Sequence, residues 1–258
     1  MIRVGVAGAG GRMGATVCNA VALDPDLELV AAVDPSALGR NVAGVEIAPS
    51  LRAFVDAECD VVVDFTAADA ARTTVPFLAM HGIHAVVGTT GLNDDDLTSW
   101  REEFPDGDDG PNCVVAANFS ISAVVMMRLA EIAAPYFETA EIIELHHDGK
   151  VDAPSGTALA TAERMAAASD TWGADPTTRE VVAGVRGGTG PAGIHLHSVR
   201  MRGMVAHQEV ILGALGQTLT IRQDSYDRES FMPGVVLACK HVGEHRGLTV
   251  GLDRLLNL

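Results

Sequence analysis

Residues 2–14 read Ile-Arg-Val-Gly-Val-Ala-Gly-Ala-Gly-Gly-Arg-Met-Gly, and this stretch decides the fold of the first half of the chain. The apolar residues 2–7 predict a buried strand, and the apolar segment that runs from the glycines through Ala22 predicts a helix. Strand, glycine turn and helix in this order form the phosphate-binding start of a dinucleotide-binding fold. The alternative interpretation is a plain tight turn between a strand and a helix.

The glycine spacing departs from the strict GxGxxG motif, because Met13 stands at the third glycine position and the pattern is GxxGxxG at Gly8, Gly11 and Gly14. A second predicted strand, residues 27–33, ends at Asp34. An acidic side chain there accepts hydrogen bonds from ribose hydroxyls. Pro35 follows, and no Arg adjoins Asp34 to hold a 2′-phosphate. This favours NADH, but Arg40 could reach in from the loop, so NADPH stays open.

Three further predicted strands, within residues 60–66, 84–91 and 113–119, end in polar or small residues. The ends are Phe65-Thr66, Gly88-Thr89-Thr90 and Ala117-Asn118-Phe119. In an open parallel sheet the ligand lies at the carboxyl ends of the strands. We therefore expect these three ends to form the nicotinamide side of a cofactor pocket.

After Asn118 the pattern changes. Helical segments at 122–136 and 155–169 flank a strand at 140–145, and residues 193–202, 208–215 and 217–223 alternate as strands. This predicts a second, α+β domain with a mixed sheet and helices on one face. The open face of such a sheet commonly pairs with a symmetry mate, which predicts an oligomer. The last segments are expected to return to the first domain.

Residues 144–158 read Glu-Leu-His-His-Asp-Gly-Lys-Val-Asp-Ala-Pro-Ser-Gly-Thr-Ala, a strand end, a charged turn and a helix start. Helix N-termini attract anions, and two imidazoles and an ammonium stand beside this one. We therefore expect the catalytic and substrate site here, carried by His146, His147 and Lys150. Ser155 or Thr157 can cap the helix, and the Ser155 hydroxyl could instead bind a substrate carboxylate.

The net charge of −16, from 34 acidic residues against 18 basic ones, argues against binding to nucleic acid or anionic membranes. No apolar run approaches a membrane span, so we expect a cytoplasmic protein. Only Lys150 and Lys240 are lysines, and this acidic, Lys-poor composition predicts a halophilic source, with an ordinary acidic enzyme as the alternative.

No metal site is predicted, because the cysteines are scattered and no third ligand stands at suitable spacing from His195 and His197. We expect a sheet-surface or interface role for these two histidines.

The chain resembles the dihydrodipicolinate reductase (4-hydroxy-tetrahydrodipicolinate reductase) family over nearly its whole length. The matching segments are Gly8–Gly14, 63–66, 88–91, 117–120, 144–158 and the tail from His195 through Asp253. The resemblance implies NADH- or NADPH-dependent reduction of a cyclic dicarboxylate in the diaminopimelate route to lysine. It also implies a homotetramer, a Rossmann-type cofactor domain at 1–118 and 228–258, and a substrate and tetramerisation domain at 119–227.

The resemblance also assigns roles to individual residues. It makes His146 a proton donor or acceptor, Lys150 the proton donor, and His147, Gly156 and Thr157 substrate contacts. The implied cofactor contacts are Gly8, Ala9, Gly10, Gly11, Arg12, Met13, Asp34, Gly88, Thr89, Thr90, Ala116, Ala117, Asn118 and Phe119, beside Phe65 and Thr66 from the strand ends. Another nicotinamide-dependent dehydrogenase, acting on an amino-acid semialdehyde or amine, is the alternative. A dinucleotide-sensing regulator would need a basic DNA-reading module, and none is evident.

Overall fold

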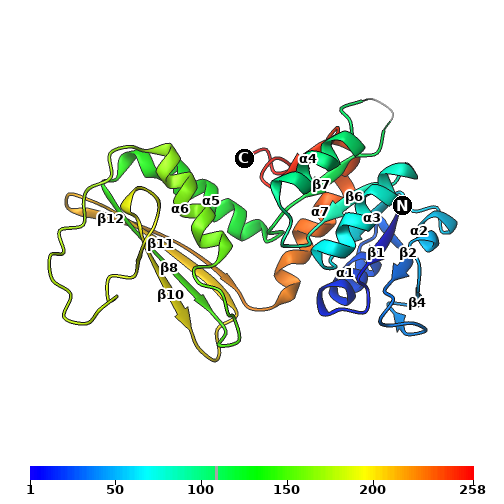
Figure 1. The fold of residues 1–258 in the computed structure, drawn as a ribbon, viewed down its shortest axis with the longest axis horizontal. Helices are drawn as coiled ribbons and strands as arrows, with labels where there is room; N and C mark the ends of the chain where they lie inside the picture. The colour runs from blue at the N-terminus through cyan, green and yellow to red at the C-terminus, as the bar shows by residue number, and fades with distance from the viewer. Residues whose placement is uncertain (108–109) are drawn as a thin grey trace. The chain divides into compact units, whose positions relative to one another are not determined.

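The computed structural model describes residues 1–107 and 110–258, and the chain forms two compact units (Figure 1). The first unit comprises residues 1–121 and 228–258, and the second comprises residues 122–227. The acidic residues of the segment 106–111 predict an exposed turn, and residues 108 and 109 of this segment lie outside the described part of the chain. None of the helices in the described ranges is long and apolar enough to cross a membrane.

The first unit is built on an eight-stranded sheet of order β13-β7-β6-β5-β1-β2-β4-β3. Every pairing is parallel except that of β3 with β4. The chain runs from β1 to β2 on one side and returns to β5 on the other, so the strand order reverses at β1, the point where open parallel sheets bind ligands at the carboxyl ends of their strands. The strands are β1 (Ile2–Ala7), β2 (Leu27–Val33), β3 (Asn41–Val42), β4 (Val45–Ala48), β5 (Val61–Asp64), β6 (His84–Val87), β7 (Cys113–Val115) and β13 (Leu248–Val250).

Helices pack on this sheet because its central strands are apolar on both faces, as the fully buried residues Val61, Val62 and Val63 of β5 show. The helices are α1 (Arg12–Leu23), α2 (Arg52–Asp56), α3 (Ala68–Met80), α4 (Asp94–Glu103) and α7 (Met232–His241), with the short 3-10 turns η3 (Arg228–Phe231) and η4 (Val242–Glu244). The C-terminal segment adds β13 to β7, so both ends of the chain build this unit. The predicted Rossmann-type α/β architecture is confirmed.

Strands β5, β6 and β7 are shorter than the sequence indicated. They end at Asp64, Val87 and Val115, so the polar residues that follow lie in loops just beyond the sheet. The sequence patterns also missed the β3–β4 hairpin and helix α2. Strands of two and four residues are too short to show a periodic pattern.

The second unit contains a five-stranded sheet of order β12-β11-β8-β10-β9, and the predicted mixed sheet is confirmed. Strand β8 pairs in parallel with β10, and the other pairs are antiparallel. Gln223 bonds to Ser122 and Gln208 bonds to Thr161, which places α5 and α6 on the same sheet face. The elements are α5 (Ile121–Ala133), η1 (Ala134–Tyr136), β8 (Thr139–His146), α6 (Gly156–Ala168), β9 (Gly188–Thr189), η2 (Pro191–Gly193), β10 (His195–Arg200), β11 (Ala206–Ala214) and β12 (Gln217–Ser225).

Candidate active site

The glycine turn after β1 has no room for a side chain where Gly14 packs against Gly8. A Cβ on Gly14 would lie 2.0 Å from the carbonyl oxygen of Gly8, and Gly8 itself has a φ of +78°. Helix α1 begins beyond Gly11, and within the described chain no side chain caps this start and its first turn holds no acid. The N–H groups of Gly8, Ala9, Gly10 and Gly11 donate to acceptors within the protein, so the N–H groups at the start of α1 are the ones that suit a phosphate. The residues fit the pyrophosphate of a dinucleotide.

Asp34 follows β2 and lies against the glycine turn. Its Oδ2 accepts a hydrogen bond from the Gly10 N–H at 3.0 Å, and its Oδ1 accepts from the N–H and hydroxyl of Ser36 at 2.9 and 2.6 Å. Burial raises the pKa of Asp34, but the bonds from Ser36 and Gly10 and the charge of Arg40 outweigh it and lower the pKa below its ordinary value. The carboxylate is therefore ionised and suited to accept bonds from ribose hydroxyls.

The predicted polar strand ends meet through Asp64, the fully buried last residue of β5. Its Oδ1 accepts from the backbone N–H and hydroxyl of Thr66 at 3.0 and 2.7 Å, and from the hydroxyl of Thr89 at 2.6 Å. No role was predicted for Asp64 from the sequence. A buried carboxyl that ends a strand of valines is the signal that could have identified it.

Aromatic packing completes this edge of the sheet. The rings of Phe65 and Phe119 lie 5.9 Å apart, and a Cβ on Gly88 would come within 2.3 Å of the Phe65 ring. The Ala116 N–H donates to Val87, which joins β7 to the end of β6. The structure thus brings the three predicted ends together, with Thr90 and Ala117 exposed and Asn118 half-buried beside them.

In the second unit, His146 ends β8 and is held by the carboxylate of Glu144. Strand alternation puts the two residues on one face, and His146 Nδ1 lies 2.5 Å from Glu144 Oε2. Arg200, at the end of the neighbouring strand β10, donates to both Glu144 oxygens at 2.7 and 2.8 Å. The Glu144 side chain is only 1% exposed, so this is a buried charge matched by a bidentate guanidinium.

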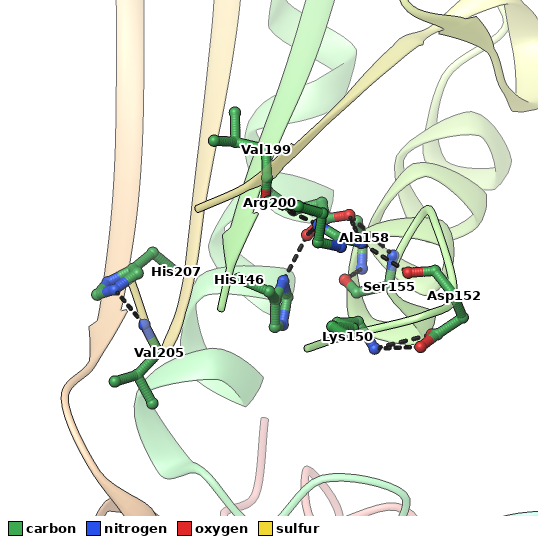
Figure 2. A network of polar contacts seen from close by, with 10 residues as sticks. His146, Lys150, Asp152, Ser155, Ala158, Val199, Arg200, Val205 and His207 are labelled. Atoms are coloured by element: carbon green, nitrogen blue, oxygen red, sulfur yellow. Dashed lines mark hydrogen bonds and ion pairs between the residues drawn. The ribbon is translucent and has the colours of Figure 1, made fainter. Parts of the chain in front are cut away.

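Lys150 lies in the loop between β8 and α6, where its Nζ donates to both carboxylate oxygens of Asp152 at 2.8 Å (Figure 2). Arg200 also donates to the backbone oxygen of Asp152 at 2.7 Å, and Arg202 pairs with Asp148 at 2.9 Å. The end of β10 therefore anchors the loop that carries the lysine. The neighbouring His147 is exposed.

Helix α6 starts at Gly156, directly after this loop. Ser155 is its N-cap, and the Ser155 hydroxyl accepts from the Ala158 N–H at 3.2 Å, which is the capping alternative of the two predicted roles. The Ser155 N–H donates to Glu144 Oε1 at 3.2 Å. A Cβ on Gly156 would meet nothing within 4 Å. The helix start carrying Gly156 and Thr157 has no acid in its first turn, which suits a substrate carboxylate.

The electrostatics of this cluster favour a neutral imidazole. Burial lowers the pKa of His146, and the charges of Lys150 and Arg200 lower it too, while the Glu144 carboxylate raises it; the net pKa lies below the ordinary value. Burial raises the pKa of Glu144, but bonds from Arg200, Ser198 and His146 bring it below its ordinary value. At about pH 7, Glu144 is therefore ionised and His146 is neutral.

No roles were predicted from the sequence for Arg200, or for Glu144 and Asp152, although these two lie within the polar run of residues 144–158. Glu144 could have been noticed as a charged residue two positions before His146, and so on the same face of the strand. For His195 and His197 of β10 the sequence predicts a sheet-surface or interface role, and in the structure they pair with carboxylates, His195 with Asp175 at 3.1 Å and His197 with Glu141 at 2.6 Å.

Comparison with known proteins identifies the family. The family model described as "Dihydrodipicolinate reductase, N-terminus" matches residues 2–119, and that described as "Dihydrodipicolinate reductase, C-terminus" matches residues 122–256. A 4-hydroxy-tetrahydrodipicolinate reductase of Corynebacterium urealyticum is 48% identical over 261 residues, and that of Cutibacterium acnes is 48% identical over 263 residues. Both alignments cover 100% of this chain and 100% of the relative.

Solved structures agree. Dipicolinate-bound dihydrodipicolinate reductase from Paenisporosarcina sp. TG-14 superposes with a TM-score of 0.89 at 36% identity, covering 98% of this chain and 99% of that chain. An amine dehydrogenase from Mycobacterium smegmatis has a TM-score of 0.61 at 16% identity, covering 98% and 95%, which shows a shared fold alone. With both family models and full-length relatives in agreement, the chain belongs to the dihydrodipicolinate reductase family.

Proposed function

We propose that this chain is a 4-hydroxy-tetrahydrodipicolinate reductase, which uses NADH or NADPH to make tetrahydrodipicolinate in the diaminopimelate route to lysine. The full-length relatives at 48% identity carry this name, and the N-terminal family model covers the glycine turn and Asp34. Substrate and product differ by the replacement of a hydroxyl by hydrogen. One hydride and one proton therefore enter, and one water leaves.

The observation that carries the proposal is the cluster at the end of β8. His146 ends strand β8, and Lys150 lies in the loop that joins β8 to the start of α6. Lys150 supplies the proton, because an ammonium has donors only, whereas His146 is held neutral. His147, Gly156 and Thr157 hold a substrate carboxylate, since a helix start and an imidazole both favour an anion. The Ser155 hydroxyl supports this helix start as its cap.

The first unit holds the cofactor in this proposal. The N–H groups at the start of α1 bind the pyrophosphate, and Asp34 binds the ribose hydroxyls. The edge formed by Phe65, Thr66, residues 88–90 and residues 116–119 orients the nicotinamide ring, which supplies the hydride when the cofactor is bound. Arg40 is near enough to lower the pKa of Asp34, so its guanidinium is the group that would accommodate a 2′-phosphate.

A coupled assay tests the proposal. The product of dihydrodipicolinate synthase is supplied with NADH or NADPH, and the loss of reduced nicotinamide is followed while the product is identified by mass. We expect oxidation that depends on the synthase product and yields tetrahydrodipicolinate. No oxidation above background with either cofactor contradicts the proposal, as does activity confined to an amino-acid semialdehyde or an amine.

The oligomer, the salt requirement and the cytoplasmic location stay predictions. For the homotetramer, the support is the sheet face opposite α5 and α6, where half-buried apolar residues lie on adjacent strands, namely Ile143, Leu145, Val199 and Ile211. Light scattering should give four times the mass of the 26.9 kDa chain, and a monomer contradicts this.

For the halophilic source, the support is the charge of −16, and full stability at low salt contradicts it.

A further inference from the structure

We propose that Glu144 and Arg200 form a positioning pair that fixes His146 in one tautomer, with its hydrogen on Nδ1 and the lone pair on Nε2. The inference rests on the proposed function, because it concerns the histidine of that same site. The pair touches neither substrate nor cofactor in this account. It acts by deciding which ring nitrogen His146 presents as an acceptor.

Donors surround the Glu144 carboxylate from three directions. Arg200 Nη2 and Nη1 donate to Oε1 and Oε2 at 2.7 and 2.8 Å, and the Ser155 N–H donates to Oε1 at 3.2 Å. Arg is always charged, so a carboxylate in a bidentate pair with it is ionised and can only accept hydrogen bonds. His146 Nδ1 lies 2.5 Å from Oε2 and must therefore carry the hydrogen.

The other ring nitrogen is left for chemistry. No hydrogen-bond partner contacts His146 Nε2 within residues 1–107 and 110–258. The histidine side chain is 17% exposed, so Nε2 is reachable from outside while Nδ1 is held by a carboxylate that is 1% exposed. A neutral imidazole with its hydrogen on Nδ1 presents Nε2 as a pure acceptor.

The same pair also fixes the loop that carries Lys150. Arg200 Nη2 donates to the backbone oxygen of Asp152, whose carboxylate holds Lys150 Nζ, and Glu144 binds the N–H of Ser155. Residues 152 and 155 are thus tied to one buried ion pair. Imidazole, ammonium and helix start are positioned by a single salt bridge between β8 and β10.

The chain contains a second arrangement of the same chemistry, which provides a matched control. Glu141, also on β8, accepts from His197 Nε2 at 2.6 Å and from Arg186 Nη2 at 2.5 Å. Glu141 and Glu144 lie on opposite faces of the strand, because they are three residues apart. Replacing Glu141 therefore removes a carboxylate from a His–Glu–Arg trio without touching the cluster around His146.

The test is ¹⁵N NMR of histidine-labelled full-length protein, with the His146 signals assigned by their loss in His146→Gln. In the wild type we expect one neutral tautomer, with the hydrogen on Nδ1. In Glu144→Gln the amide can donate as well as accept, so the Nε2–H tautomer appears and kcat falls at least about tenfold, as for other partners that orient a functional histidine. The KM for NADPH stays unchanged. Glu141→Gln changes the His197 signals and leaves the His146 signals and kcat as in the wild type.

Two results overturn the proposal: a His146 tautomer that is the same in Glu144→Gln as in the wild type, or a loss of kcat in Glu141→Gln equal to that in Glu144→Gln. Because Glu144→Gln leaves a buried guanidinium unpaired and could fail to fold, the double variant Glu144→Gln with Arg200→Met, which removes both charges, is measured in the same way. The NMR result needs no substrate. Absence of wild-type reductase activity therefore refutes the proposed function separately from the tautomer.

Discussion

Gly14→Ala is the substitution whose effect on cofactor binding follows most directly from the structure. The added Cβ would lie 2.0 Å from the Gly8 carbonyl oxygen, 2.6 Å from its carbonyl carbon and 2.9 Å from the Ala9 Cα. Non-bonded carbon atoms prefer roughly 3.5–4 Å, so the turn has to move by about 1 Å. All three contacts are with backbone, which cannot rotate away as a side chain could.

Overpacking of this kind costs about 1–3 kcal/mol of unfolding free energy. Loss of one hydrogen bond to a charged phosphate costs about 1.5–3 kcal/mol, which weakens NADPH binding roughly 10- to 150-fold. Urea unfolding and calorimetric titration with NADPH measure the two effects. Gly11→Ala, with its Cβ 3.2 Å from the same oxygen, should be milder, and Gly107→Ala, with its nearest neighbour at 3.9 Å, should match the wild type. Wild-type NADPH affinity in Gly14→Ala would refute the reasoning.

Three further predictions concern single carboxyl and imidazole groups. Asp34→Ala removes the acceptor at the end of β2, so the KM for NADH should rise about tenfold with kcat little changed; an unchanged KM in steady-state kinetics contradicts this. Asp64→Ala removes the carboxylate that accepts from the buried Thr89 hydroxyl at 2.6 Å and leaves it only the backbone oxygen of residue 64 at 3.4 Å, which should cost about 1–3 kcal/mol in urea unfolding; a loss near zero would show that the Asp64 carboxylate does not tie the strand ends together. The pKa of His146 is lower in the folded than in the unfolded chain, so its contribution to stability is present at a pH above the unfolded-state pKa and is lost as the pH falls through the folded-state pKa. Between about pH 7.5 and about pH 5.5, the wild type should therefore lose more unfolding free energy than His146→Gln does. Equal losses would contradict a buried neutral imidazole.

The parts of the fold that depend on residues close together in the sequence could be predicted from the sequence. The apolar run of β1, the glycines and α1 follow one another within residues 2–23, and steric limits on the turn decide the glycine positions. The convergence of residues 65–66, 88–90 and 116–119 was also predictable, because carboxyl ends of parallel strands meet at one edge. The hydrogen bond from Thr89 to Asp64 was not predictable, since the register that joins Asp64 to Val87 involves residues far apart in sequence.

The same reason explains what was missed in the second unit. His146 and Lys150 lie within one short run of unusual composition, so the sequence analysis could identify the site. Arg200 reaches Glu144 across 56 residues of chain, through the parallel register that sets Ser198 beside Glu144 and Arg200 beside His146. No local pattern contains this register. The preference for NADH or NADPH also stays open, because it depends on where the Arg40 guanidinium lies when a 2′-phosphate is present.

The most direct test of the account uses the two lysines of the chain. Lys150 bonds to Asp152 in the candidate site, and Lys240 pairs with Asp24 and Asp26 on the first unit. With the synthase product and NADPH, kcat of Lys150→Ala should fall by about 10²- to 10⁴-fold with NADPH affinity unchanged, because the proton donor is lost, and kcat of Lys240→Ala should equal that of the wild type. Near-normal turnover by Lys150→Ala, or an equal loss in both variants, would contradict the assignment of proton transfer to this site.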